Sequence, residues 1–302
     1  MYNFSNLTII IVTFLTSKQT LLNCLNSIDK KIKVILVENS SKFKYQNFFQ
    51  NKFKNLKIFC SGKNLGYGGG NNFGLKKVNT NYALILNPDT ILDKSFFKNL
   101  NSLLDNKKFS IIGCELAENK DYVTGGFFDE KKNKVFRKEF FNLKRKNLTK
   151  VDWVTGSSMI LNLKKIKYKD IFDENFFLYF EEFDLCQRLK RQNHDIFLCK
   201  SLKIHHLGFK SSYHNAPDFK DEAENLRNWH WMWSQYFYYK KNYNYLNVFL
   251  RSILKLLNSA FKSFFYQIIF DKKNKNKYFY RSLGLLSSML GYKSFYRGKF
   301  FN

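Results

Sequence analysis

A segment dense in carboxylates and aromatic rings, residues 172–188, holds the side chains best suited to chemistry. It reads FDENFFLYFEEFDLCQR, and its acids are Asp173, Glu174, Glu181, Glu182 and Asp184. Carboxylates buried against apolar rings need a cation, a metal or a proton-transfer role to offset their desolvation. Apolar surroundings also raise a carboxylate pKa, which suits a general base. The start of an amphipathic helix has the same composition, so the segment by itself leaves both interpretations open.

The first half of the chain predicts an α/β fold that could position such groups. Apolar, β-branched runs predict buried strands, and a helical pattern with Thr16 or Ser17 as its cap follows the first of them. The predicted strands are residues 7–14, 33–37, 56–60 and 82–86. Their alternation with helices predicts a parallel sheet, in which ligands bind at the carboxyl ends of the strands. Thr13, Glu38 and the loop after Cys60 are therefore expected at one edge.

Two segments at this edge are suited to phosphates and a cation. Residues 62–74 read GKNLGYGGGNNFG, and such glycines permit close backbone approach and a turn into a helix N-terminus. The segment matches no standard nucleotide-binding pattern, and a flexible turn is the alternative. The fourth strand leads into Asn87-Pro88-Asp89-Thr90, which places Asp89 where a carboxylate can hold a divalent cation bridging phosphates. A plain β-turn is the alternative here.

The second half continues the pattern with an insertion. Residues 121–150 are irregular and basic, which predicts a mobile insertion over a site. Strand-like sequence at 151–161, a helix ending at Gln192 and a strand at 195–199 follow. The pair His205 and His206 comes next and could supply a metal or phosphate ligand, or be structural.

The net charge of +27, from 51 basic and 24 acidic residues, predicts an anionic partner. Nucleic acid, an anionic membrane surface and phosphorylated substrates all remain candidates at this point. The excess is local: residues 240–302 hold thirteen basic residues and one acid, a balance of +12. The five scattered cysteines include no CxxC pair, which predicts reduced thiols in a cytosolic protein. The N-terminus lacks the features of a signal peptide, and no uncharged apolar run reaches transmembrane length.

The C-terminal part predicts helices. Pro217-Asp218 precedes a long aromatic helix, and residues 248–270 form an amphipathic pattern. Its apolar positions are Leu250, Leu254, Leu257, Phe261, Phe264 and Ile268. The pattern fits a helix in a membrane interface or a helix packed in a bundle, and both interpretations stay open.

Seven of these segments, in order, resemble the family-2 glycosyltransferases, in particular the rhamnosyltransferase-like branch. They are IVTF at 11–14, VENSS at 37–41, NLGYGGGNNFG at 64–74, LNPDT at 86–90, DWVTGSSMI at 152–160, FDENFFLYFEEFDLCQRL at 172–189 and HLGFKS at 206–211. The resemblance implies a GT-A fold: a Rossmann-like, mostly parallel sheet flanked by helices. It implies a nucleotide-sugar-binding half at about residues 1–115, an acceptor and catalytic half at 116–215, and a basic helical extension at 216–302.

The resemblance also implies roles for individual residues. Glu182 is the general base, and Asp89 with His206 holds a divalent metal, Mg²⁺ or Mn²⁺. The donor-binding positions are Thr13, Glu38, Asn64, Gly66, Asn72, Asn87 and Asp89. The acceptor or supporting positions are Trp153, Gly156, Glu181, Asp184 and Ser211. The chain departs from the family pattern with Glu in place of Asp at positions 38 and 182, and with Leu15 where Asn is common.

The expected function is inverting transfer of a sugar, with rhamnose a candidate, from a nucleoside-diphosphate donor in cell-surface polysaccharide biosynthesis. The expected acceptor is a glycan or a polyprenyl-diphosphate-linked glycan. The expected place is the cytoplasmic face of the membrane, bound peripherally to its anionic surface, with no nucleic-acid partner. A nucleic-acid-binding protein is one alternative, although the acids of residues 172–188 count against it. A nucleotidyltransferase is the other, although Thr13–Lys18 lacks its basic, glycine-rich signature.

Overall fold

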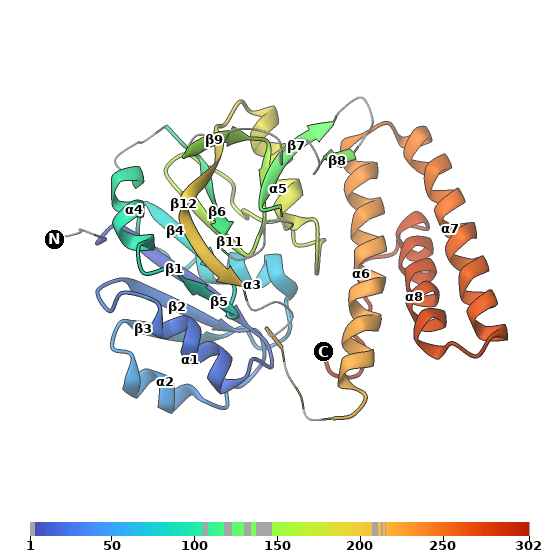
Figure 1. Ribbon diagram of the computed structural model, residues 1–302, viewed down its shortest axis with the longest axis horizontal. Coiled ribbons are helices and arrows are strands. Elements are labelled where there is room, and N and C mark those ends of the chain that lie inside the picture. The colour runs from blue at the N-terminus through green and yellow to red at the C-terminus, as the bar shows by residue number, and fades with distance from the viewer. Residues whose placement is uncertain are drawn as a thin grey trace. The chain divides into compact units, whose positions relative to one another are not determined.

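The computed structural model describes residues 4–104, 108–117, 123–129, 134–136, 147–206, 211–212, 214 and 216–301. The chain divides into two compact units (Figure 1). The first comprises Met1–Leu65, Gly69–Phe172 and Glu182–Tyr213, and the second comprises Gly66–Gly68, Asp173–Glu181 and His214–Asn302. The functional division after residue 215 stays a prediction. The structural units differ from it because two short internal segments group with the C-terminal helices.

The first unit is built on a mixed sheet that has nine strands among the described residues, in the order β3-β2-β1-β4-β11-β6-β12-β5, with β9 paired to β12. The strands are β1 (Leu7–Thr13), β2 (Lys33–Glu38), β3 (Leu56–Cys60), β4 (Tyr82–Leu86), β5 (Thr90–Leu92), β6 (Ile111–Leu116), β9 (Leu148–Val151), β11 (Ser158–Asn162) and β12 (Ile196–His206). The pairings leave β5, β9 and β11 antiparallel to the other six. The sheet is therefore mostly parallel, as the apolar runs predict.

In the part of the chain that the structure describes, five helices accompany the sheet in chain order: α1 (Lys18–Asn26), α2 (Gln46–Lys52), α3 (Gly66–Leu75), α4 (Phe96–Leu104) and α5 (Glu181–Arg191). Ser17 caps α1, since its hydroxyl accepts a hydrogen bond from the Thr20 backbone N–H at 3.1 Å. The core contains side chains such as Ile9, Leu36 and Leu84, which are fully buried. Burial on both faces explains why these strands read as continuous apolar runs.

The glycine-rich segment is a helix rather than a flexible loop. Residues 66–75 form α3, and Gly70 and Gly74 lie against side chains of the sheet. A Cβ on Gly70 would lie 2.7 Å from Val12 Cγ1, and one on Gly74 would lie 2.8 Å from Ile10 Cγ2. These glycines therefore let a helix approach the sheet more closely than larger residues permit.

The expectation of irregular structure at 121–150 is wrong for the residues that the structure describes there. β7 (Gly125–Asp129) pairs with β8 (Lys134–Phe136) and with β10 (Trp153–Val154) in a second small sheet. The Asp152 carboxylate anchors this sheet to α5: it accepts hydrogen bonds from the Phe128 backbone N–H at 2.9 Å and from Lys190 Nζ at 2.8 Å. The sequence also predicted that residues 121–150 are mobile and lie over a site. Most of these residues lie outside the described ones.

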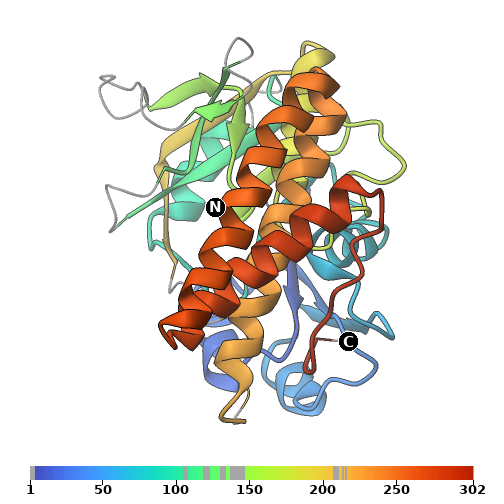
Figure 2. The same cartoon turned by 90° about the vertical axis from the view of Figure 1, so that its right-hand side faces the viewer.

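The described residues of the second unit include the long helices α6 (Phe219–Asn242), α7 (Tyr245–Ile268) and α8 (Lys272–Met289). Figure 2 shows α7 and α8 side by side, and α8 also packs on α6. A Cβ on Gly284 of α8 would lie 2.1 Å from the Trp229 carbonyl oxygen of α6, so this glycine sets the close approach. None of the helices in the described residues is both long and apolar enough to cross a membrane.

Candidate active site

Asp89 and His206 are brought together by strand pairing between distant parts of the chain. Asp89 follows β4, and the antiparallel register of β5 with β12 sets Thr90 opposite His206. The Asp89 Oδ1 and His206 Nε2 atoms lie 3.3 Å apart, and the Asp89 side chain is 1% exposed. The neighbouring His205 turns to Asp93 instead, at 3.8 Å, as alternation along a strand requires.

The residues of this pair fit a divalent cation. Carboxylate oxygen and imidazole nitrogen both ligate such ions, and two ligands bonded at about 2.1 Å in neighbouring positions lie about 3 Å apart. Asp89 Oδ1 and His206 Nε2 are buried atoms at a compatible separation. Within the described residues no group of three or more His, Cys, Asp or Glu could hold a metal.

Thr13 and Glu38 meet at the carboxyl ends of β1 and β2. Thr13 Oγ1 donates to Glu38 Oε2 at 2.9 Å, and Ser40 Oγ donates to Glu38 Oε1 at 2.8 Å. Burial raises the pKa of Glu38, while the hydrogen bonds from Ser40 and Thr13 lower it in part. Each carboxylate oxygen can accept a further hydrogen bond. Glu38 is thus held in a fixed orientation at the sheet edge.

Asn39, which is not among the predicted site residues, organises the same edge. Its side chain accepts hydrogen bonds from the Leu65 backbone N–H and from Ser61 Oγ, both at 3.1 Å. Its Nδ2 donates to Asn64 Oδ1 at 3.1 Å, so the predicted donor-binding residue Asn64 belongs to this network. Its place in the sequence could have identified it, because Asn39 follows Glu38 directly at the end of a predicted strand.

Asn87 lies in a turn with partners on two sides. Its backbone N–H donates to the Ser157 carbonyl at 3.0 Å. This bond, next to the pairing of β4 with β11, places the turn at Gly156 beside Asn87. The Cys24 thiol lies beneath, with Sγ 3.7 Å from the Asn87 carbonyl oxygen. Burial and the charge of Asp89 raise the pKa of the Cys24 thiol, so it stays neutral and serves packing. All five cysteines are free in the structure, and their redox state stays a prediction.

The first turn of α5 carries three acids in different environments. Glu181 and Asp184 are buried, whereas Glu182 is half-buried and so presents the more accessible carboxylate. Trp153 is fully buried and packs edge-on against Phe183, with ring centroids 5.0 Å apart. It can therefore influence a substrate only through its neighbours. Glu182 is therefore the most exposed acid of this turn, and its role as a general base stays a prediction.

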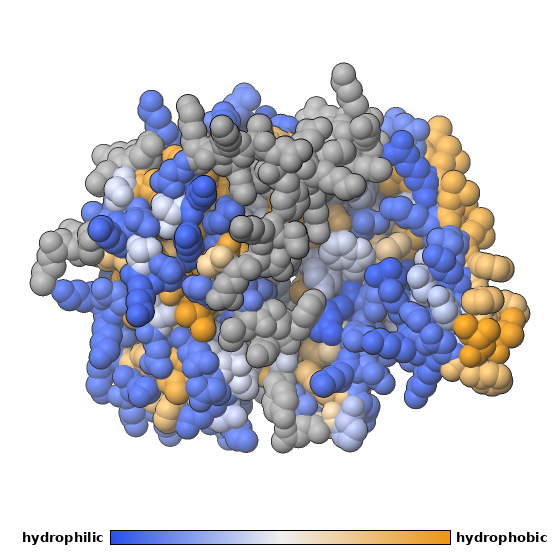
Figure 3. All heavy atoms as spheres, viewed as in Figure 1, coloured by the Kyte–Doolittle hydropathy of each residue, from blue (hydrophilic) through white to orange (hydrophobic). Residues whose placement is uncertain are grey.

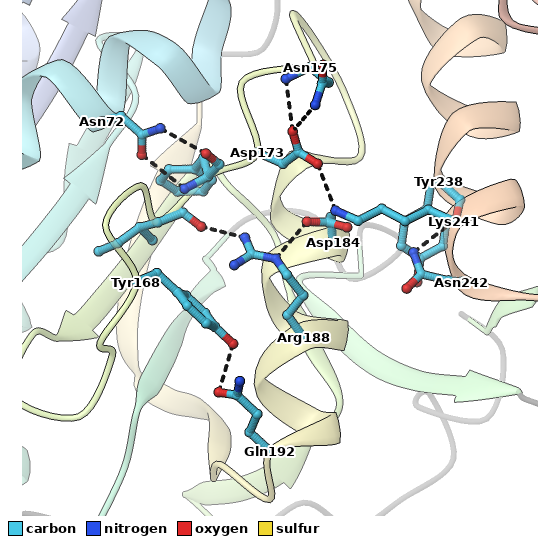
Figure 4. Close-up of polar contacts among 12 residues, drawn as sticks. Asn72, Tyr168, Asp173, Asn175, Asp184, Arg188, Gln192, Tyr238, Lys241 and Asn242 are labelled. Carbon is cyan, nitrogen blue, oxygen red and sulfur yellow. Dashed lines mark hydrogen bonds and ion pairs between the residues drawn. The ribbon is translucent and has the colours of Figure 1, made fainter. Parts of the chain in front are cut away.

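Two polar clamps fix the segment that leads into α5, as Figure 4 shows. The Asn72 side chain bonds both backbone groups of Phe172: Nδ2 donates to the carbonyl at 2.8 Å and Oδ1 accepts from the N–H at 2.9 Å. Arg188 donates to Asp184 Oδ2 at 2.8 Å and to the Ile171 carbonyl. Asp184 therefore positions Arg188, and Asn72 holds the chain. A direct contact of Asn72 with the donor stays a prediction.

Within the second unit, residues 173–181 are held against α6. The Phe180 ring packs on Trp231 and Tyr238 with centroids 5.4 Å apart in both cases. Ser234 Oγ donates to the Leu178 carbonyl at 2.8 Å. Tyr179 and Phe180 have φ values of 70° and 69°, a left-handed conformation that costs a side-chain-bearing residue energy. The packing on α6 holds this strained turn directly before Glu181.

Gly66 meets the same segment in the second unit. Its φ is +76°, and an added Cβ would lie 2.2 Å from the Phe177 carbonyl oxygen, which accepts a hydrogen bond from the Tyr67 N–H at 2.9 Å. We expect Gly66→Ala to lower the free energy of unfolding by about 3 kcal/mol, since it combines a left-handed alanine with a backbone clash. Urea denaturation measures this value.

Gly62→Ala is the matched control for that substitution. Gly62 also has a positive φ, +84°, but nothing lies within 4 Å of its added Cβ. It should cost about 1 kcal/mol, from backbone conformation alone. Equal losses in the two variants would show that the contact with Phe177 does not constrain Gly66.

Ser211 completes the set of predicted site residues. Thr16 Oγ1 donates to the Ser211 carbonyl, and Ser212 Oγ donates to the Phe14 carbonyl at 2.8 Å, which ties this segment to the end of β1. The first unit thus brings Thr13, Glu38, Asn87 and Asp89 to one edge of the sheet, with His206 beside Asp89. Gly66 and Glu181 group with the second unit.

Two proteins of known activity are similar in sequence to this chain. The chain is 27% identical over 230 residues to a low-salt glycan biosynthesis hexosyltransferase of Haloferax volcanii, which covers 72% of this chain and 74% of that protein. It is 24% identical over 192 residues to the rhamnosyltransferase WbbL of Escherichia coli K12, which covers 56% and 70%.

Solved structures share the fold. GalNAc-T7 with UDP, GalNAc and Mn²⁺ superposes with a TM-score of 0.56 at 11% identity, over 78% of this chain and only 51% of that one. S. aureus TarS residues 1–349 with UDP-GlcNAc superposes with a TM-score of 0.50 at 13% identity, over 95% and 92%. The predicted GT-A fold with a C-terminal helical extension is confirmed. The family model "Glycosyl transferase family 2" matches residues 8–166, more than half of the 302-residue chain. The chain therefore belongs to glycosyl transferase family 2.

Proposed function

We propose that this protein is an inverting hexosyltransferase that uses a nucleoside-diphosphate sugar as donor. The acceptor is a glycan or a polyprenyl-diphosphate-linked glycan of cell-surface polysaccharide biosynthesis. The observation that carries the proposal is the buried pair of Asp89 and His206 at the carboxyl edge of the sheet. This edge is where open α/β sheets bind their ligands. Family membership favours sugar transfer over the nucleic-acid-binding and nucleotidyltransferase alternatives.

The proposed mechanism assigns proton transfer to Glu182. Its half-buried carboxylate takes the proton of an acceptor hydroxyl while that oxygen attacks the anomeric carbon. The bond between the anomeric carbon and the diphosphate oxygen breaks on the opposite face, so the configuration inverts. The proton remains on Glu182 until solvent removes it. The ion pair of the buried Asp184 with Arg188, and the packing of Trp153 on Phe183, keep the first turn of α5 in place for this step.

The donor end of the site is assigned to the edge of β1, β2 and β4. Glu38, fixed by Thr13 and Ser40, accepts hydrogen bonds from the nucleoside. Asp89 and His206 would hold Mg²⁺ or Mn²⁺, which when bound would neutralise the charge on the leaving diphosphate. The Asn39 network with Asn64 shapes the adjoining loop.

The names of the relatives support the class of sugar. One is a hexosyltransferase and the other a rhamnosyltransferase, so we propose a hexose or a deoxyhexose such as rhamnose. A polyprenyl-linked acceptor is embedded in a bilayer, and an enzyme that acts on it must approach the lipid surface. We therefore place the protein peripherally at the cytoplasmic face of the cell membrane.

A donor panel tests the proposal. The full chain is incubated with UDP-, dTDP- and GDP-sugars, Mn²⁺ and a polyprenyl-diphosphate-linked acceptor, and release of the nucleoside diphosphate is followed. We expect one donor to exceed the others at least tenfold, EDTA to stop its turnover, and the product to show inverted anomeric configuration by NMR. Retained configuration, or release of pyrophosphate in place of a nucleoside diphosphate, would contradict the proposal.

A further inference from the structure

α7 buries a polar side and exposes an apolar one, the reverse of a helix that packs in a water-soluble bundle. Ser252 and Ser259 are buried, and Ser263 Oγ donates to the Lys275 carbonyl of α8 at 3.3 Å. The opposite side, half a turn away at 3.6 residues per turn, is exposed and apolar. We call it the outer stripe, and it consists of Leu250, Leu254, Leu257, Phe261, Phe264 and Ile268. A helix in water usually buries its apolar side and exposes its polar one.

The outer stripe is long and continuous. It spans about 27 Å from Leu250 to Ile268 at 1.5 Å per residue, and Leu254 and Phe261 are 69% and 68% exposed. Apolar side chains gather over α7 along the right-hand edge in Figure 3. Phe270 in the turn after α7 is 89% exposed, in a left-handed conformation with φ of 56°. Apolar surface of this extent indicates an interaction site.

The basic residues around the outer stripe indicate which kind of partner it binds. Residues 240–302 carry thirteen basic residues and one acid, Asp271, and Lys272 and Lys273 are exposed next to Phe270. The headgroup region of an anionic bilayer offers apolar chains to the stripe and negative charge to the lysines. A second copy would bring two basic surfaces together in a two-fold interface, which like charges oppose. Nucleic acid offers no apolar surface for leucines.

We infer that the outer stripe of α7, with Phe270, lies in the interface of an anionic bilayer, with the helix axis along the membrane surface. This arrangement follows from an apolar side that runs along the helix, flanked by cations. It rests on the membrane location in the proposed function and adds which surface makes the contact. Lipid contact itself requires no sugar transfer, so the two can fail separately.

Flotation with vesicles tests the inference on the full chain without donor or acceptor. Leu254→Glu combined with Phe261→Glu removes the centre of the stripe, and both residues are exposed, so folding should be kept. The matched control is Asn258→Glu combined with Gln267→Glu, which adds the same two charges at exposed flanking positions of α7. Circular dichroism melting verifies that both variants fold.

On phosphatidylcholine vesicles containing phosphatidylglycerol, we expect the stripe variant to lose at least tenfold in partition coefficient and the control less than threefold. Vesicles of phosphatidylcholine alone should bind the unaltered chain at least tenfold more weakly. Equal loss in both variants, or equal binding to both vesicle types, would overturn the inference. A dimer in lipid-free light scattering that the stripe variant abolishes would assign the surface to a second copy instead. Donor turnover without lipid should be equal in the unaltered chain and the stripe variant, which separates this test from that of the proposed function.

Discussion

Asp89→Asn is expected to lower the turnover of the nucleoside-diphosphate sugar by about a thousandfold, since loss of a cation ligand removes several kcal/mol of charge stabilisation at the leaving group. Asparagine keeps the shape of the buried side chain, and its amide oxygen can still lie near His206, which is 3.3 Å away in the native protein. The melting temperature should therefore change little. A second readout is Mn²⁺ binding in the presence of nucleoside diphosphate by titration calorimetry, which should weaken strongly.

Asp93→Asn provides the matched control. Asp93 also faces a histidine of β12, His205, at 3.8 Å, but it is partly exposed and bonds Ser95 rather than belonging to the predicted site. It should leave turnover within about threefold of the unaltered enzyme, as is usual for changes away from the reacting groups. Near-normal turnover in Asp89→Asn, or equal damage in Asp93→Asn, would remove Asp89 from the mechanism.

Glu182→Gln should reduce turnover by about a hundredfold or more, because a positioned general base contributes at least that factor. Glutamine keeps size and hydrogen bonding but cannot take the acceptor proton. Donor affinity, measured by calorimetry, should stay unchanged, since none of the predicted donor positions lies on α5. The acidic limb of the pH–rate profile should disappear in the variant, a readout that a merely structural role would not move.

Glu181→Gln tests whether the general base is Glu182 or the adjacent Glu181. Glu181 is buried at the first position of α5, whereas Glu182 is more accessible. We expect Glu181→Gln to affect stability more than the pH–rate profile. A crippled Glu181→Gln enzyme beside an active Glu182→Gln enzyme would move the general base by one residue.

Local patterns predicted the framework of the first unit. Strands β1 to β4 are found within one residue of the runs at 7–14, 33–37, 56–60 and 82–86, because buried parallel strands need continuous apolar sequence. Ser17 caps α1 because a hydroxyl before a helix can accept from its first free N–H groups. The position of Asp89 after β4 followed from the same strand and needed no knowledge of distant contacts.

Contacts between distant segments decided the rest of the site. His206 reaches Asp89 only because β12 extends beyond the predicted 195–199 and pairs with β5. Residues 66–75 form a helix although glycine disfavours one, and Gly70 and Gly74 stand in it because Val12 and Ile10 leave no room there for side chains. A short stretch of sequence predicts neither the length of β12 nor the close approach of α3 to the sheet. Both depend on partner residues far along the chain.

The amphipathic pattern of residues 248–270 shows most clearly which structural features a sequence pattern cannot predict. It determined that a helix would form with one apolar side, because a period of 3.6 residues places those side chains together. A core and a membrane surface both require that same period, so the pattern could not choose between them. The tertiary structure decided the orientation: α7 packs through Ser252 and Ser259 and turns Leu254 and Phe261 outward, since burial depends on which neighbours the fold brings to each side.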